Sequence, residues 1–485
     1  TCMLDNPGVA EVAVILREDK PGIKRLTGYI LKKDSEVKLT ELRKHLQKYL
    51  PVHMIPTSFV VLEEFPRIPN GKVDRSAFPA PDRSRPPLEQ PFTAPLNMLE
   101  RKLKDLWCEV LDLDEIGTQD AFFDLGGDSL LAARFTGELQ KQLDEPVFVV
   151  TLFSAPTIAS YAAFLKRDYA HSVSRWLGEK TDEKTAKLSQ VLRPEDKQRY
   201  QTLIPQIELA KKKVAKKTKN PPALFILAPP RSGTTLLRVM LAGHSKLFSA
   251  NELQLLGFDS MRERAEAYSG KYALWLDGLI RTVMQLKECS ADKARAIING
   301  FEKKNTSTSD MFAALQDWIG GSILVDKSPQ YALDIPALQR AERDFDNPLY
   351  IQLVRHPYAM GSSFVKRRMQ QVVYLKENDF SDRETGELVW LESHRRTAEF
   401  LESIPANRKL VLRYEDLVTE PRVAMELLCA TFNLPFEEAI LNPYADLDNK
   451  MVDGVQADST PMGDPKFMQQ QSINPQLADA WKGVL

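Results

Sequence analysis

The sequence has few cysteines, no long apolar run and almost no net charge, and each shortage excludes a class of protein. Its 485 residues include four cysteines, scattered singly, so neither a disulfide framework nor a cysteine metal site is expected. No apolar stretch approaches the ~20 residues that span a bilayer. The formal net charge of −1 gives no overall field that would attract nucleic acid or an anionic membrane. We therefore expect neither as a partner.

The chain also lacks an initiator methionine and a signal-peptide pattern, since it begins with Thr1-Cys-Met-Leu-Asp-Asn6. We interpret it as a fragment of a longer, cytoplasmic polypeptide. At this length two or three domains are expected. The cysteines lie in or beside apolar stretches, which is typical of buried free thiols in a reducing compartment. They are Cys2, Cys108, Cys289 and Cys429.

The most informative stretch is a short apolar run, Leu224–Leu227, followed by a turn and then by apolar residues at helical spacing from Leu236 onward. The run has the character of a buried parallel strand. The turn comprises Arg231, Ser232, Gly233, Thr234 and Thr235. Its backbone N–H groups, a helix N-terminus and its hydroxyls favour an anion, so a phosphate cradle is predicted. The nucleotide-binding pattern Gly-x-x-x-x-Gly-Lys-Ser/Thr is not matched, because Thr234 stands at the lysine position.

A second strand pattern, Tyr350–Val354, ends at Arg355, and Ser363 follows eight positions later in a helical pattern. Arginine makes forked, charge-assisted bonds to phosphate, and serine adds a donor. A phosphate cradle combined with such a second strand resembles the sulfotransferases. The resemblance covers residues 222–485. It implies an α/β, P-loop-like fold with a central parallel sheet and 3′-phosphoadenosine 5′-phosphosulfate (PAPS) as donor, with adenosine 3′,5′-bisphosphate as product.

The resemblance also assigns residues to the two ends of the donor. The turn at 231–235 would hold the 5′-phosphosulfate, and Arg355 and Ser363 would hold the 3′-phosphate. A late segment that contains Gly463 and Asp464 resembles the loop that closes over the same 3′-phosphate.

Sulfuryl transfer to an alcohol needs cations against developing charge and a base for the hydroxyl proton. It needs no metal, and no cluster with metal-ligand spacing is visible in the sequence. Glu252 stands where tyrosylprotein-type sulfotransferases carry their acid, among apolar residues that favour proton uptake, and is the predicted base. His244 is the alternative base. Lys327, at a third strand end, would stabilise the leaving phosphate, unless it is a surface lysine paired with an aspartate. Arg238 faces the bridging oxygen or pairs with an acid.

Residues 96–166 have a compact helical pattern that contains Asp124-Leu-Gly-Gly-Asp-Ser-Leu130. This turn places Ser129 at a helix start, where serine is often only a cap. With Phe122 and Phe123 before the turn and leucines after it, the segment resembles peptidyl carrier proteins, which are four-helix bundles. The resemblance implies that Ser129 bears 4′-phosphopantetheine, whose thiol carries an acyl or peptidyl chain.

Residues 1–80 have the pattern of a small α+β unit. Strands are expected at Val9–Leu16, Leu26–Leu31 and Ile55–Leu62, and a helix at Lys38–Tyr49. A turn at Asn70-Gly71 presents Lys72. This unit resembles the C-terminal subdomain of adenylation domains, in which such a lysine reaches the acyl carboxylate and the α-phosphate of ATP. The large subdomain is missing, so we expect no adenylation activity from this chain.

A Pro-rich linker, 81–95, and a helical linker, 167–221, separate the three units. The whole resembles a nonribosomal peptide synthetase fragment fused to a sulfotransferase domain of the olefin synthase and curacin type. The expected acceptor is therefore a hydroxyl, by analogy a β-hydroxyl, of an acyl, aminoacyl or peptidyl chain on Ser129. The expected partners are a large adenylation subdomain upstream and a thioesterase downstream. The alternatives are a non-catalytic docking domain and another phosphate-loop transferase, such as a kinase.

Overall fold

The structure is a computed structural model, and its described residues fall into two compact units, Thr1–Ala186 and Lys187–Leu485. It describes residues 2–5, 8–20, 23–33, 37, 39–50, 54–56, 58–86, 88, 90–179, 192–204, 218–373, 378, 380–451, 467 and 470–484. Within these ranges no helix has the length and apolar character needed to cross a membrane.

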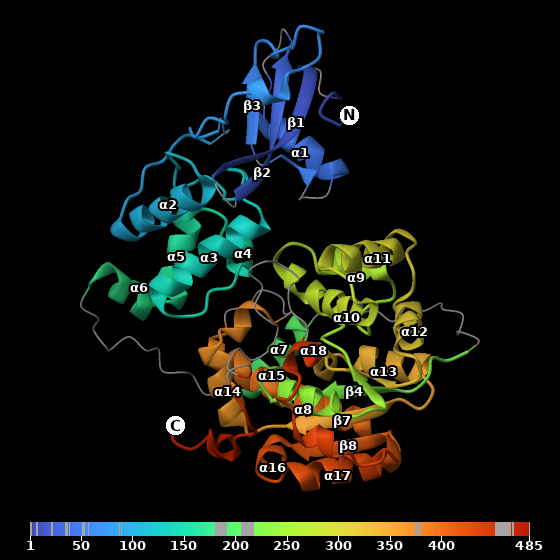
Figure 1. Ribbon diagram of the computed structural model, residues 1–485. Coiled ribbons are helices and arrows are strands. Elements are labelled where there is room, and N and C mark those ends of the chain that lie inside the picture. The colour runs from blue at the N-terminus through green and yellow to red at the C-terminus, as the bar shows by residue number, and fades with distance from the viewer. Residues whose placement is uncertain are drawn as a thin grey trace. The chain divides into compact units, whose positions relative to one another are not determined.

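A three-stranded sheet and one helix form the start of the first unit (Figure 1). The elements are β1 (Val9–Lys20), β2 (Ile23–Lys32), α1 (Leu39–Tyr49) and β3 (Ser58–Leu62). The strand order is β1-β2-β3, with β1 and β2 antiparallel and β2 and β3 parallel. Leu42 and Leu46, one turn apart on α1, pack in one apolar cluster with Ile30 of β2. The α+β prediction for this segment is confirmed.

The carrier segment is a small helical bundle around an aromatic core. Its helices are α2 (Met98–Leu111), α3 (Ser129–Leu143), α4 (Val150–Ser154) and α5 (Ile158–Asp168), followed by α6 (Ala170–Leu177). Trp107 is fully buried and meets Phe122 and Phe135 edge-on, at centroid distances of 4.9 and 5.9 Å. The predicted bundle is confirmed. Helix α6 lies in the stretch expected to be a linker, yet its Val173 belongs to the same core.

A five-stranded parallel sheet organises the second unit. Its strands, in spatial order, are β5 (Leu247–Ser249), β6 (Ile323–Asp326), β4 (Ala223–Leu227), β7 (Leu349–Val354) and β8 (Lys409–Arg413). The chain starts at the central strand β4, builds one edge and then builds the other, so β4 is the point at which the strand order reverses. In open α/β sheets, ligands bind at the carboxyl ends of strands beside such a point. The parallel sheet was predicted, but β5, only three residues long, was not.

Helices cover both faces of this sheet (Figure 1). Both faces must be covered because successive side chains of β4 point to opposite faces and all of them are apolar and buried. Phe225 and Leu227 pack in one apolar cluster with α10 to α13 and α15, whereas Leu224 and Ile226 pack in another with α8, α16 and α17. The helices of the first face are α10 (Asp277–Lys287), α11 (Ala291–Lys303), α12 (Thr308–Ile319), α13 (Ile335–Asp344) and α15 (Asp382–Glu402). Those of the second are α8 (Thr234–Leu241), α16 (Tyr414–Thr419) and α17 (Pro421–Thr431).

The remaining described helices include α7 (Pro194–Leu203), α9 (Met261–Ala267), α14 (Pro357–Lys366) and α18 (Leu447–Lys450). Helix α7 lies in the predicted helical linker, and its buried Tyr200 packs with apolar residues of the second unit. All four cysteines are free thiols: Cys2, Cys108 and Cys289 are half-buried, and Cys429 is buried.

Candidate functional site

Each strand of the parallel sheet is followed by a polar or aromatic group, and these groups lie at the carboxyl-terminal ends of the strands. Across the sheet from β5 to β8, these are Glu252, Lys327, the turn at 231–235, Arg355 and Tyr414. Neighbouring strands lie ~4.8 Å apart, so the set extends over roughly 20 Å across the five strands. The central strand β4 therefore divides the predicted donor residues of β7 from the predicted catalytic residues of β5 and β6.

The turn after β4 has the backbone shape of an anion-binding nest. Arg231 and Gly233 both adopt the left-handed conformation, with φ of 69° and 86°, on either side of Ser232. Such alternation turns successive N–H groups toward one concavity, and here the nest leads into the N-terminus of α8. Ser232 is fully buried, and its Oγ has no hydrogen-bond partner within the described ranges. The residues present thus fit a bound phosphate.

An aromatic ring joins this turn to Arg355. A Cβ at Gly233 would lie 2.1 Å from Cδ2 of Tyr414, so only glycine leaves room for the ring. The Arg355 guanidinium carbon lies 4.5 Å from the centroid of the same ring, a cation–π contact. Tyr414, the first residue of α16, therefore holds the cradle and Arg355 in position relative to each other.

The structure brings Arg231, Arg355 and Ser363 together. Arg355 Nη1 donates to the Arg231 carbonyl at 2.8 Å, and Arg231 Nε donates to Ser363 Oγ at 3.0 Å. Trp390 Nε1 donates to the Arg355 carbonyl at 2.8 Å and so fixes the backbone there, a role that no sequence signal indicated. Arg355 Nε is buried and finds no acceptor in the described part of the chain. Arg231, expected only at the 5′ end, also contacts the residues expected at the 3′-phosphate.

On the other side of β4, the predicted base and the predicted cation form one buried ion pair. Lys327 Nζ donates to Glu252 Oε1, and the two side chains are 5% and 12% exposed. Lys327 is thus not a surface lysine paired with Asp326. The apolar setting expected for Glu252 also needs correction, because an ammonium group contacts its carboxylate. Removing one member would leave the other as an uncompensated buried charge.

A buried network holds the loop that carries Glu252. Asp326 accepts hydrogen bonds from the hydroxyls of Ser328 and Tyr331, both at 2.8 Å, and from the Leu253 N–H at 3.4 Å. The Tyr331 oxygen accepts in turn from the Leu255 N–H at 2.9 Å. Burial raises the pKa of Asp326 to about 6, although these donors work against the rise. This network was not foreseen from the sequence.

Helix α10 closes on the same loop from another side. A Cβ at Gly278 would lie 2.0 Å from the Glu252 carbonyl oxygen and 2.7 Å from its carbonyl carbon. Thr282, one turn later, accepts from the Asn251 N–H at 3.2 Å. The backbone of Glu252 is therefore placed by direct contact with a helical glycine, for which no sequence motif exists.

Arg238 lies on α8, fully buried. Its Nη1 donates to the carbonyls of Ser249 at 3.3 Å and Lys450 at 3.1 Å. Burial lowers the pKa of Arg238 to about 10, an effect that the nearby Glu252 opposes and Arg281 adds to. Of the two roles expected, no direct pairing with an acid is present among the described residues, but the positive charge of Arg238 acts on the Glu252 carboxylate.

His244 is not placed with these groups. Its Nε2 bonds the Pro435 carbonyl at 2.8 Å, and its Nδ1 accepts from the Lys246 N–H at 3.0 Å, so both ring nitrogens are engaged. His244 precedes β5 whereas Glu252 follows it, so the strand itself separates the two side chains. The alternative of His244 as base is not supported by this geometry. Gly463 and Asp464 lie outside the described residues.

In the carrier segment, Ser129 is the first residue of α3, but it is not the cap. Asp128 is the N-cap, and its side chain accepts from the Leu131 N–H at 2.8 Å. The Leu131 N–H at the helix start therefore has a hydrogen-bond acceptor that is not the Ser129 hydroxyl. The Ser129 side chain is outside what the structure describes. A Cβ at Gly127 would lie 2.3 Å from the Phe122 ring, so this glycine permits the tight turn.

Lys72 is exposed on a hairpin turn, as predicted. The preceding Gly71 has φ of 83°, and the Ile68 N–H donates to the Lys72 carbonyl at 2.9 Å to close the turn. The Asn70 side chain accepts from the Lys72 backbone N–H at 3.1 Å and so supports the same turn.

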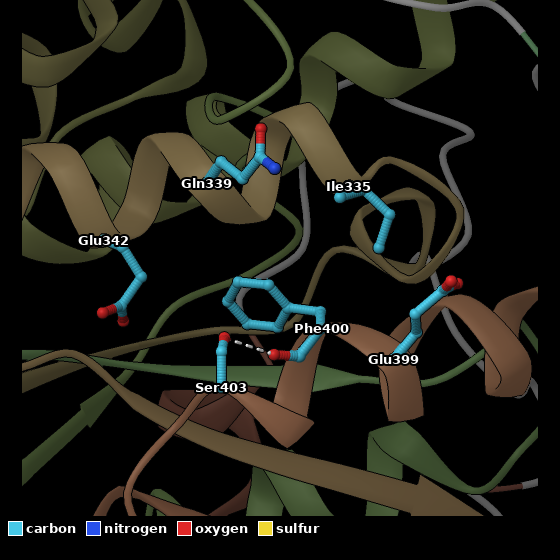
Figure 2. A pocket seen from close by; sticks show the side chains of 6 residues that line it. All are labelled: Ile335, Gln339, Glu342, Glu399, Phe400 and Ser403. Atoms are coloured by element: carbon cyan, nitrogen blue, oxygen red, sulfur yellow. Dashed lines mark hydrogen bonds between the residues drawn. The ribbon is translucent and has the colours of Figure 1, made fainter.

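A pocket of about 520 Å³ lies elsewhere, between α13 and α15 (Figure 2). It is lined by Ile335, Gln339, Glu342, Glu399, Phe400 and Ser403. Arg408 pairs with Glu342, and Arg395 pairs with Glu399, so both carboxylates are already neutralised. None of the lining residues belongs to the turns that follow the strands, and the pocket is not part of the candidate site.

Three family profiles match the chain. The profile described as "Sulfotransferase family" matches residues 222–438, "Phosphopantetheine attachment site" matches residues 101–165, and "AMP-binding enzyme C-terminal domain" matches residues 1–72.

Among solved structures, the sulfotransferase domain from the curacin biosynthetic pathway is 42% identical, with a TM-score of 0.50; the match covers 55% of this chain and 93% of that one. The sulfotransferase domain of the Synechococcus PCC 7002 olefin synthase is 37% identical, with a TM-score of 0.49, over 57% of this chain and 92% of that one.

The N-terminal part is similar to curated synthases. A dimodular nonribosomal peptide synthase of Bacillus subtilis (strain 168) is 41% identical over 163 residues, which are 34% of this chain and 7% of the relative. The chain thus spans only a small part of this relative. The resemblance to a synthetase fragment fused to a sulfotransferase is confirmed. The chain belongs to the sulfotransferase family, and its sulfotransferase domain follows an adenylation-enzyme C-terminal domain and a phosphopantetheine attachment domain.

Proposed function

We propose that the chain transfers the sulfuryl group of PAPS to a hydroxyl of an acyl, aminoacyl or peptidyl chain that is held as a thioester on Ser129. One observation supports this most strongly. The sheet order sets an arginine and serine cluster on one side of the phosphate cradle and the buried Glu252–Lys327 pair on the other. Such a site has an anion-binding half and a proton-accepting half.

The donor half fits a molecule with two separated anionic groups. Backbone N–H groups of residues 232–235 would face the 5′-phosphosulfate, and Arg355 and Ser363 would face the 3′-phosphate. Arg231 lies between them and would act on both. The unpartnered Ser232 hydroxyl and Arg355 Nε support this assignment, since each would gain an acceptor. When bound, PAPS supplies an activated sulfuryl group on a good leaving phosphate.

In the catalytic half, Glu252 accepts the proton of the acceptor hydroxyl. Its ion pair with Lys327 links that step to the donor. Once the carboxylate takes the proton it no longer holds the ammonium group, which then stabilises negative charge on the leaving oxygen. Arg238, held by the carbonyls of Ser249 and Lys450, adds positive potential at the Glu252 carboxylate.

The acceptor would arrive on the carrier. The phosphopantetheine attachment domain supports a thioester-bound chain, and the 42% identical curacin-pathway domain supports sulfuryl transfer within an assembly line. In this proposal Ser129 bears the 4′-phosphopantetheine arm. A large adenylation subdomain upstream and a thioesterase downstream would complete the synthetase.

Intact-mass analysis tests the proposal. Ser129 is loaded with a synthetic 3-hydroxyacyl-phosphopantetheine, and PAPS is added to the whole chain. A mass gain of one sulfonate group is expected, and it should be absent in the Ser129→Ala variant. A phosphate gain with ATP in place of PAPS would indicate a kinase. Binding of the loaded carrier with no gain from either donor would indicate a docking domain.

A further inference from the structure

Three side chains around the Glu252 loop end in polar groups that no described residue satisfies. They are the whole carboxamide of Gln254, the indole N–H of Trp275 and the amide nitrogen of Gln330. Gln254 is 1% exposed and Trp275 is 6% exposed. Folded proteins pair the large majority of buried polar side-chain atoms, so three unpaired groups around one loop are candidates for contacts with a ligand.

Arg264 of α9 and Tyr268, which follows that helix, link the three residues that carry these groups. Arg264 donates from Nε to the Gln254 carbonyl at 3.1 Å and from Nη2 to the Trp275 carbonyl at 3.3 Å, so one guanidinium spans both residues. Tyr268, one turn further along, donates its hydroxyl to Gln330 Oε1 at 2.6 Å. That bond fixes the Gln330 carboxamide and leaves its nitrogen as a donor.

The same groups lie next to the reacting pair. Gln254 is two residues beyond Glu252, at most about 7 Å along the chain. Its N–H donates to Ser328 Oγ at 3.0 Å, and Ser328 directly follows Lys327. Gln254 also holds φ of 52°, a left-handed conformation that costs free energy in a residue with a side chain. The loop is thus held in an unfavourable shape at the position where the acceptor hydroxyl must approach.

The chemistry of the three groups is selective. Trp275 and Gln330 offer only donors, which suit carbonyl oxygens. Gln254 offers both a donor and an acceptor, which is the pattern that a secondary amide complements. A plain hydrocarbon chain would leave all three groups unpaired in a buried site.

We propose that Gln254, Trp275 and Gln330 form an acceptor subsite that binds a secondary amide and a neighbouring carbonyl of the carrier-bound chain. The inference rests on the proposed sulfuryl transfer for the identity of the acceptor, but not for the binding itself. The amide belongs either to the pantetheine arm or to an aminoacyl or peptidyl cargo, and both present the same chemistry.

Three small probes separate these sources. Each is a thioester with a β-hydroxyl: 3-hydroxybutyryl ethyl thioester has no amide, its N-acetylcysteamine analogue has the amide in the arm, and N-acetylserine ethyl thioester has it in the cargo. Binding is titrated by NMR with adenosine 3′,5′-bisphosphate present. At least one amide probe is expected to bind about tenfold more tightly than the amide-free probe. The tighter of the two identifies the source.

Variants assign that preference to the subsite. Gln254→Met keeps the size of the side chain, and Trp275→Phe removes the N–H while keeping an aromatic ring. Each is expected to reduce the preference to about twofold or less while leaving affinity for the bisphosphate unchanged. Thr397→Val on α15 removes a different buried hydroxyl, one with no partner among the described residues, and is expected to retain the preference. If Gln254→Met does not fold, the result with Trp275→Phe alone tests whether the preference depends on the subsite.

The subsite is overturned if the wild-type chain binds all three probes alike, or if the folded variants keep the wild-type preference. A failure of the proposed function has a different signature. If the probes show the preference but PAPS transfers nothing to any of them, the subsite stands and sulfuryl transfer is rejected.

Discussion

Replacing Gly278 with alanine tests the placement of Glu252 without removing any functional group. The added methyl group would lie 2.0 Å from the Glu252 carbonyl oxygen, where contacts under 3.0 Å force atoms to shift. The clashing atoms are backbone, so they have no rotamer that avoids the contact. Either the Glu252 loop or the start of α10 must move by about 1 Å or more.

The expected effect follows from that displacement. A 1 Å misplacement of a catalytic group lowers rates by about 10²-fold, so single-turnover sulfuryl transfer should fall by this factor. Affinity for adenosine 3′,5′-bisphosphate should not change, because its proposed phosphate ligands lie on the turn after β4, at the end of β7 and on α14, and not on the Glu252 loop or α10. Overpacking costs about 1–3 kcal/mol, and the gain in helix propensity of ~1 kcal/mol offsets part of it, so the variant should still fold.

Gly300→Ala is the matched control. Gly300 also lies inside a helix, α11, but a Cβ there would meet nothing within 4 Å. This variant should keep the wild-type rate and gain up to ~1 kcal/mol of stability. Rapid-quench mass spectrometry gives the rate, and titration calorimetry gives the bisphosphate affinity. A folded Gly278→Ala chain with the wild-type rate would refute the reasoning that this contact places Glu252 for transfer.

Glu252→Gln removes the proton acceptor and should slow single-turnover transfer by about 10²–10⁴ with donor affinity intact, while His244→Asn should be mild; the reverse result would exchange their roles. Arg355→Ala should weaken bisphosphate binding at least about tenfold by calorimetry, and an unchanged Kd would reject its assignment. Ser129→Ala should abolish sulfation of carrier-bound substrate but not nucleotide binding; loss of both would mean that the carrier is not a separate unit. Burial lowers the pKa of His394 to about 4. As the pH falls below 6.5, His394 therefore binds a proton in the unfolded chain before it does so in the folded one. By pH 4 the free energy of unfolding of the wild type should fall by up to ~3 kcal/mol relative to His394→Gln, measured from urea midpoints. A difference that does not vary with pH would refute this.

Much of the sheet could be predicted because its central strands are continuous apolar runs between turns. Strands β4 and β7 carry such runs, and the residues that follow them have a recognisable phosphate-binding character. Strand β5 escaped prediction because three residues give no periodicity. His244 looked eligible as a base for the same reason, since nothing in the sequence revealed a strand between it and Glu252.

The contacts that complete the site could not be predicted. Glu252 and Lys327 are 75 residues apart, and they meet only because β5 and β6 are neighbours in the sheet. The contact of Tyr414 with Gly233 likewise depends on how β8 leads into α16. Both follow from strand order and packing, which local patterns do not encode. The sequence identified Glu252 and Lys327 as site residues, but it did not predict that they contact each other.

The strand order also has a consequence for how such domains can diversify. Apart from Arg238 on α8, the proposed acceptor-side groups are carried by one continuous stretch, residues 247–331, whereas the proposed 3′-phosphate ligands Arg355 and Ser363 come later in the chain. Recombination within β4–α8 and after η5 (Pro329–Leu333) would exchange the acceptor specificity as a single cassette. The nucleotide half would be inherited unchanged, so a new carrier-bound substrate would not require a new donor site.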